Sequence, residues 1–205
     1  MYKSRFGLII GFQGCDLKFR DDVINNRTIF NPSNNNYDWL GSGMYFWENN
    51  KQRALSFSNE LKDVKRGQSG KINNPAVLGA VIDLGYCLDL LDEEFIVMIK
   101  NSYLMLEQYY KPLNIQLPEN KPIKNSTDLL LRNLDCAVIE NLHKERIINN
   151  LRQFDSVRGA FFEGRSLYPN AGFNEKNHIQ ICVRNSNCIK GFFIPREESN
   201  SFIVP

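Results

Sequence analysis

Residues 38–49 read DWLGSGMYFWEN. Large aromatic side chains stand close to Gly41 and Gly43, a composition that predicts a short strand over residues 43–47 with little bulk at its start. The ring of Tyr45 offers a flat surface on which a planar ligand can stack. The alternative is a core strand whose aromatic side chains are simply buried.

The flanking segments carry strand, loop and helix patterns in turn. Alternating apolar residues predict a strand over residues 6–12 that ends at Gln13 and Gly14, and residues 25–42 have no period, which predicts a long loop. Further along we predict a helix over 51–66 capped by Asn49 or Asn50 and stopped by Gly67, a loop over 67–74, a strand over 75–84, a helix over 92–110, no regular element over the proline-containing stretch 112–122, a longest helix over 126–150, strands over 156–162, 178–184 and 188–194, and an irregular loop over 163–177.

Length and composition indicate one domain. The chain has 205 residues, of which 42% are hydrophobic, and this is enough for one full core but short for two. We therefore predict a single domain over residues 1–205, of the α+β class with strands concentrated at the two chain ends. Five cysteines without a CxxC pair predict buried, reduced thiols, with neither a disulfide framework nor a metal site.

Charge and hydropathy limit the classes of partner that the chain can bind. Lys and Arg total 25 against 23 for Asp and Glu, so the net charge of +2 gives no general attraction for a polyanion, and a nucleic-acid partner needs a local basic patch. No apolar run approaches the roughly 20 residues that a bilayer span requires. The N-terminus lacks an export signal. We expect a cytoplasmic protein that does not contact a membrane.

The first strand ends in residues that favour either a turn or a ligand. Gln13 points opposite Phe12 by the two-residue period of a strand, and Gly14 leaves room for another molecule near the backbone. The plainer interpretation is a strand that ends in an ordinary glycine turn with a solvated glutamine.

A late strand has one apolar and one polar face. Its alternation places His178 and Gln180 on the polar face, together with Cys182 and Arg184. Such a face is either the floor of a cleft or a solvated edge, in which case His178 is an ordinary surface residue. The other histidine, His143, lies on the predicted longest helix and is expected at the surface.

Together these three segments resemble the ADP-ribosyltransferase superfamily, on the side of diphtheria toxin and poly(ADP-ribose) polymerase. That side is marked by a His-Gly at the end of the first strand, a Gly-x-Gly-x-Tyr-Phe segment leading into a helix, and a Glu on a late strand. Residues 13–14, 41–46 and 178–180 stand at these three places. More closely, the pattern is similar to bacterial phage-defence toxins of the toxin-antitoxin-chaperone type, whose acceptor is messenger RNA.

The resemblance implies a single-domain fold with a split β-sheet core and flanking helices, and NAD as the substrate. NAD would lie between the first strand and the strand of Tyr45, with nicotinamide stacked on Tyr45 and its carboxamide held by backbone near Gly14. Gln180 would orient the ribose, and His178 would take a proton from the acceptor. The implied cofactor-binding residues are Gln13, Gly14, Gly43 and Tyr45, and the implied catalytic residues are Tyr45, His178 and Gln180.

Two residues depart from the family pattern. Gln13 replaces the His, although its amide can still bond a ribose hydroxyl. Gln180 replaces the Glu and brings no negative charge to the transition state. Glu163 or Glu175, in the loop before the late strand, are candidates to supply that charge. Without it, turnover is slow, or the chain is a degenerate module that only binds NAD.

The implied partners are NAD, messenger RNA or another nucleic-acid acceptor, and antitoxin and chaperone proteins. A transferase that modifies protein in place of RNA is the alternative. Six cations can form a basic rim for a phosphate backbone, or they are ordinary solvated charges. They are Lys51, Arg53, Arg158, Arg165, Lys176 and Arg184.

Overall fold

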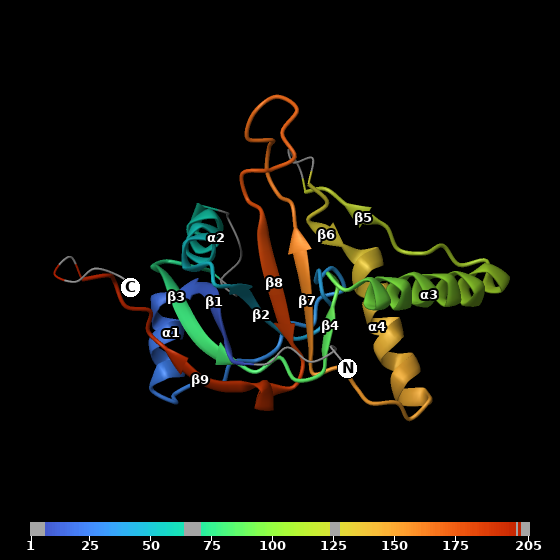
Figure 1. The fold of residues 1–205 in the computed structure, drawn as a ribbon, viewed down its shortest axis with the longest axis horizontal. Helices are drawn as coiled ribbons and strands as arrows, with labels where there is room; N and C mark the ends of the chain where they lie inside the picture. The colour runs from blue at the N-terminus through green and yellow to red at the C-terminus, as the bar shows by residue number, and fades with distance from the viewer. Residues whose placement is uncertain (1–6, 64–70, 124–127, 200, 202–205) are drawn as a thin grey trace.

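Two sheets and four helices make up the computed structural model, which describes residues 7–63, 71–123, 128–199 and 201 (Figure 1). The strands are β1 (Ile9–Asp16), β2 (Met44–Glu48), β3 (Pro75–Ile82), β4 (Cys87–Asp89), β5 (Asn120–Lys121), β6 (Leu131–Arg132), β7 (Ser156–Phe161), β8 (His178–Val183) and β9 (Ile189–Phe193). The helices are α1 (Leu17–Ile24), α2 (Lys51–Asp63), α3 (Glu93–Tyr110) and α4 (Asn133–Ile148). The predicted α+β class is confirmed.

Seven strands form the main sheet in the order β4-β7-β8-β2-β1-β3-β9, and β5 pairs with β6. Neighbours in the main sheet are antiparallel except β4 and β7, which are parallel. The split core that the resemblance implies is not confirmed, because the seven strands form one sheet; within it β1 and β2 share two residue pairs, Gly11 with Glu48 and Phe12 with Trp47. Beyond Phe12, β1 is no longer paired with β2.

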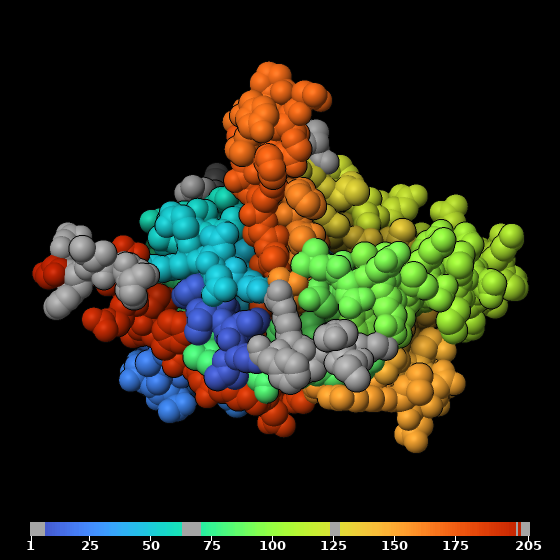
Figure 2. All heavy atoms as spheres, in the orientation of Figure 1, coloured from blue at the N-terminus to red at the C-terminus, as the bar shows by residue number. Residues whose placement is uncertain are grey.

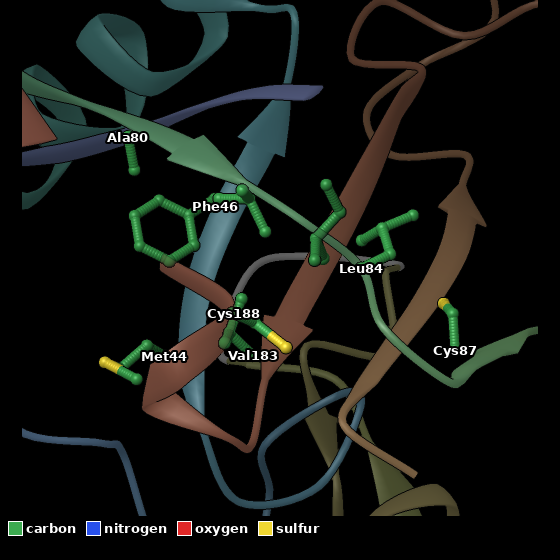
Figure 3. Packing of buried hydrophobic residues seen from close by; sticks show 9 residues of the cluster. Met44, Phe46, Ala80, Leu84, Cys87, Val183 and Cys188 are labelled. Atoms are coloured by element: carbon green, nitrogen blue, oxygen red, sulfur yellow. The ribbon is translucent and has the colours of Figure 1, made fainter. Parts of the chain in front are cut away.

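Apolar side chains from the centre of the main sheet form a core cluster, in which Phe46, Ile82 and Ile181 are fully buried. Figure 3 shows side chains from β2, β3 and β8 pointing toward one another, with Cys188 beside Val183 and Cys87 farther out. All five cysteines are buried and none is in a disulfide, which confirms the prediction of buried, unpaired thiols.

Several predicted elements shift at their ends. β1 runs through Gln13 and Gly14 to Asp16, so these residues pair with β3 and do not form the expected turn. α1 was not predicted; it begins where the Asp16 carboxylate accepts a hydrogen bond from the amide of Lys18. The predicted cap of α2 is confirmed, since Asn50 Oδ1 accepts from the Arg53 amide at 2.9 Å, whereas the Gly67 stop lies outside the described residues.

The helix expected over 126–150 begins later than predicted, at Asn133, while residues 126 and 127 lie outside the described part of the chain. The start is set from elsewhere in the chain, because Asn120 Oδ1 accepts hydrogen bonds from the amides of Leu134 and Asp135. At 16 residues α4 is shorter than α3, which has 18. The stretch 112–122 also contains short elements, β5 and the end of a 3₁₀ turn over Lys111–Leu113.

His143 is buried in α4, which corrects the expected surface position. Its ring packs edge-on against Phe154 with centroids 5.9 Å apart, and its Nε2 has no hydrogen-bond partner among the described residues. Burial lowers the pKa of His143 from 6.5 to about 4, because the charged imidazolium is poorly solvated there. His143 therefore folds as a neutral side chain.

Acid is expected to destabilise the protein through this group. The unfolded chain binds the proton more tightly, so the stability due to neutral His143 is complete above about pH 6.5 and is lost as pH falls to about 4. The loss across this window is about 3 kcal/mol. Urea unfolding at pH 4 and pH 7.5 should show a smaller pH dependence for His143→Gln than for wild type. Parallel pH profiles for the two proteins would contradict this assignment.

Candidate functional site

The pairing of β2 with β8 brings together residues from the middle and the end of the chain. Tyr45 lies opposite Cys182, and Trp47 lies opposite Gln180. Because directly paired residues and alternate residues share a face, Tyr45, Trp47, Gln180 and His178 all project from the same side of the sheet. We call this side the β2–β8 face. Two predicted catalytic partners of Tyr45 are thus on its own face.

His178 is buried on the β2–β8 face and is not the surface residue of the plainer interpretation. Its ring is surrounded by Trp39, Trp47 and Phe161, with centroids 6.3, 6.2 and 5.7 Å away. Nδ1 lies 2.7 Å from the carbonyl oxygen of Lys176. Since a carbonyl can only accept, Nδ1 carries the proton and Nε2 is the bare, basic nitrogen.

Two observations describe the chemical state of that nitrogen. Burial lowers the pKa of His178, so the ring is neutral at physiological pH. His178 Nε2 is buried and has no hydrogen-bond partner within the described residues. A cavity of about 450 Å³ is also lined by His178, together with Glu48, Asn49 and Asn177. The site therefore holds a neutral, buried imidazole with an unused acceptor, whereas Glu48, Ala160 and Ile179, which also line the cavity, project from the opposite face of the sheet.

Glu163 lies next to His178, whereas Glu175 does not. The Glu163 carboxylate is 3.0 Å from the guanidinium of Arg53 and 3.8 Å from His178 Nδ1. Glu175 bonds instead to Arg165 within the loop over 163–177, which projects from the ends of β7 and β8 (Figures 1 and 2). Of the two candidate carboxylates, only Glu163 is part of the site.

Arg53 is a site residue whose role the sequence did not reveal. Only 7% of it is exposed, and its guanidinium lies 5.6 Å from the centre of the Trp47 ring. Its Nε has no partner within the described residues. The sequence signal that could have predicted its burial is its position in α2, since Arg53 lies one turn before Phe57 on the inward side of the helix. A buried cation therefore accompanies Glu163 and His178.

The hydroxyl of Tyr45 is held by the turn that precedes β2. It donates to the carbonyl of Gly41 at 2.6 Å and accepts from the amide of Leu40 at 2.9 Å. The positive φ of Gly41, 77°, is a conformation that suits glycine. The next residue, Ser42, donates its amide to Glu140 at 2.7 Å and accepts from Arg184 at 2.9 Å through its carbonyl. Tyr45 is thus fixed by its own turn, which is held in place by Glu140 of α4 and by Arg184, the residue after β8.

The three other predicted site residues serve packing at least in part. A side chain at Gly14 would meet the backbone oxygen of Ala54 in α2, and one at Gly43 would meet Cys182 in β8. Gln13 projects from the face opposite Gly14, and its Oε1 is buried without a partner among the described residues. The side chains of Gln13 and Tyr45 are therefore on opposite faces of the sheet.

The six cations proposed as a basic rim are all engaged in ion pairs, which favours the interpretation as ordinary solvated charges for the four that are not buried. Arg53 and Arg158 are also buried. Lys51 pairs with Glu197, Arg53 with Glu163 and Glu60, Arg158 with Glu48 and Asp89, Arg165 with Glu175, Lys176 with Glu60, and Arg184 with Glu140.

The described ranges contain neither a metal-binding group of side chains nor a membrane-spanning helix. There, no three His, Cys, Asp or Glu side chains are grouped so that they could hold a metal ion. None of the helices in those ranges combines the length and the apolar character needed to cross a bilayer. Comparison of the chain with protein-family models, with curated proteins and with solved structures found no match.

Proposed function

We propose that this chain is an NAD-dependent mono-ADP-ribosyltransferase, a toxin of a bacterial anti-phage toxin-antitoxin system that acts on RNA. One observation supports it most: β2 and β8 place Tyr45, Gln180 and His178 on one face, as the sequence resemblance requires. The orphaned, buried Nε2 of His178 fits a proton acceptor that awaits a ligand. Bound NAD supplies the ADP-ribosyl group, with nicotinamide as the leaving group.

The protein's own residues then have separate tasks. The half-buried amide of Gln180 orients a ribose hydroxyl, and the ring of Tyr45, fixed through its hydroxyl, offers a stacking surface. Gly14 is not paired with β2, so its backbone groups on that side can form hydrogen bonds with a carboxamide. His178 Nε2 takes the proton that the acceptor loses as its new bond forms.

Protein is the second candidate acceptor, and two observations favour it. The six cations expected to contact phosphates are all paired with carboxylates. The projecting loop exposes large apolar side chains at Leu167, Tyr168 and Phe173, a surface that suits a protein better than a phosphate backbone. RNA is proposed first on the strength of the resemblance alone.

Labelled NAD tests the proposal directly. Purified protein incubated with NAD labelled in its adenylate phosphate and with total cell RNA should produce labelled material that nuclease removes and protease does not. Label that protease removes would identify the second candidate. NAD that raises the melting temperature without any transfer would identify a binding module, because a ligand that binds only the native state stabilises it. Neither transfer nor a shift at millimolar NAD would overturn the proposal.

A further inference from the structure

A second cavity borders the turn that precedes β2, since Ser42 is among its lining residues. It has a volume of about 700 Å³, within the range of small-molecule sites. Its walls come from the loop before β2, from α4, and from the segment that runs from the end of α3 to β5. Asn36 lies in the loop, and Tyr110 and Gln116 lie in the segment between α3 and β5. Ser42 and Glu140 form the wall nearest Tyr45.

The charged groups around this cavity compensate one another. Glu140 is paired with Arg184 at 2.6 Å, and Lys121 lies 3.8 Å from Glu119. The Arg184 guanidinium also holds the pKa of the Glu140 carboxyl below its usual range in spite of burial, so that the pair stays ionised. A cavity without excess positive charge gives no preference for a phosphate or another anion. The occupant it fits best is uncharged.

Carboxamides supply most of the remaining polar lining. Asn34, Asn35, Asn36, Gln116 and Asn133 all contribute to the walls. Asn34 bonds Ser42 and Asn35 bonds Ser33 and Asp38, whereas the Asn36 and Gln116 side chains make no hydrogen bond within the described residues. Each free amide offers a donor and an acceptor side by side, the arrangement that reads the edge of adenine through N6 and N7. The partly exposed ring of Tyr110 adds a stacking surface.

We infer that this cavity binds adenine as an uncharged base or nucleoside, through Asn36, Gln116 and Tyr110. The inference does not depend on the proposed function, because the cavity and the β2–β8 face share neither Gln180 nor His178. Adenine can come from a free nucleoside or from an adenine in single-stranded RNA. The chemistry of recognition is the same for both.

Equilibrium dialysis with adenosine tests the inference. Wild type should bind one adenosine, and the Asn36→Ala/Gln116→Ala variant should bind it at least about tenfold more weakly, since a bidentate amide contact to adenine is lost. Both side chains are exposed and make no hydrogen bond in the described structure, so the variant should melt like wild type. Gln180→Ala, which alters only the β2–β8 face, is the matched control and should bind adenosine like wild type.

Three comparisons make the result decisive. Uridine should bind more weakly than adenosine, and AMP should bind no more tightly, because the cavity lacks excess positive charge. Short oligoadenylate that binds as well as adenosine identifies RNA as the source, and binding of adenosine alone identifies the free nucleoside. Photolabelling with 8-azidoadenosine should modify peptides that contain residues 34–36, 110–121 or 133–140. No binding of millimolar adenosine, equal binding by the double variant, or labelling confined to other peptides would overturn the inference.

Discussion

Arg158→Met is expected to lower the free energy of unfolding by about 3–5 kcal/mol, because it removes the cation from a buried ion-pair network. Arg158 is 3% exposed. It donates to Glu48 from Nε and Nη2, and to both oxygens of Asp89 from Nη1 at 3.1 Å. Methionine is similar in length but leaves the two carboxylates without this partner. Urea unfolding monitored by circular dichroism measures the change.

Two variants control for this prediction. Arg165→Met removes a cation that is 89% exposed and paired with Glu175, so the midpoint of unfolding should stay where it is. Arg158→Met combined with Glu48→Gln and Asp89→Asn removes the uncompensated charges and should recover part of the loss. An Arg158→Met midpoint equal to that of wild type would show that the network adds nothing to stability.

The strands of the site could be predicted from local pattern because burial on one face imposes a two-residue period. The alternation of residues 178–184 was enough to place His178 and Gln180 on one face, and β8 runs as predicted over His178–Val183. The aromatic run after Gly43 likewise predicted β2, which spans Met44–Glu48. Both elements are defined by residues within a few positions of one another.

Features set by distant residues could not be predicted in this way. Glu163 and Arg53 are 110 positions apart, so the charges near either residue in the sequence do not indicate that the two pair. The burial of His178 depends on Trp39 and Phe161, which reach it from a loop and from β7. A single sequence shows which side chains share a strand face, but not what lies over that face, and the state of a titratable group depends on the latter.

The start of α4 shows the same limit for the backbone. Residues 126 and 127 have good capping chemistry, yet the helix begins at Asn133, where Asn120 accepts from the first amides. A cap from another segment outweighed the local signal. The site itself was not affected, because Glu140, which accepts a hydrogen bond from the Ser42 amide, lies well inside the helix.

Gln180→Ala is expected to reduce ADP-ribosyl transfer by about 10²–10³-fold, comparable with the loss of one preorganised contact to a developing charge. NAD affinity should change far less, because an orienting contact at the reacting ribose matters most in the transition state. Gln180 lies opposite Trp47 at the centre of the β2–β8 face, and the substitution leaves that pairing intact. Single-turnover transfer and NAD-dependent melting shifts measure the two effects separately. Expression of wild type should arrest bacterial growth, and expression of Gln180→Ala should not.

Two carboxylate variants decide which residue supplies charge at the reacting carbon. Gln180→Glu keeps the shape and adds the negative charge of the family pattern, so it should raise hydrolysis of NAD by water if charge is what limits wild type. Glu163→Gln keeps the shape beside Arg53 and removes a charge 3.8 Å from His178 Nδ1. If Glu163 already compensates for Gln180, its substitution should lower transfer as strongly as Gln180→Ala, and Gln180→Glu should gain little. Transfer that survives both Gln180→Ala and Glu163→Gln would place the chemistry away from the β2–β8 face.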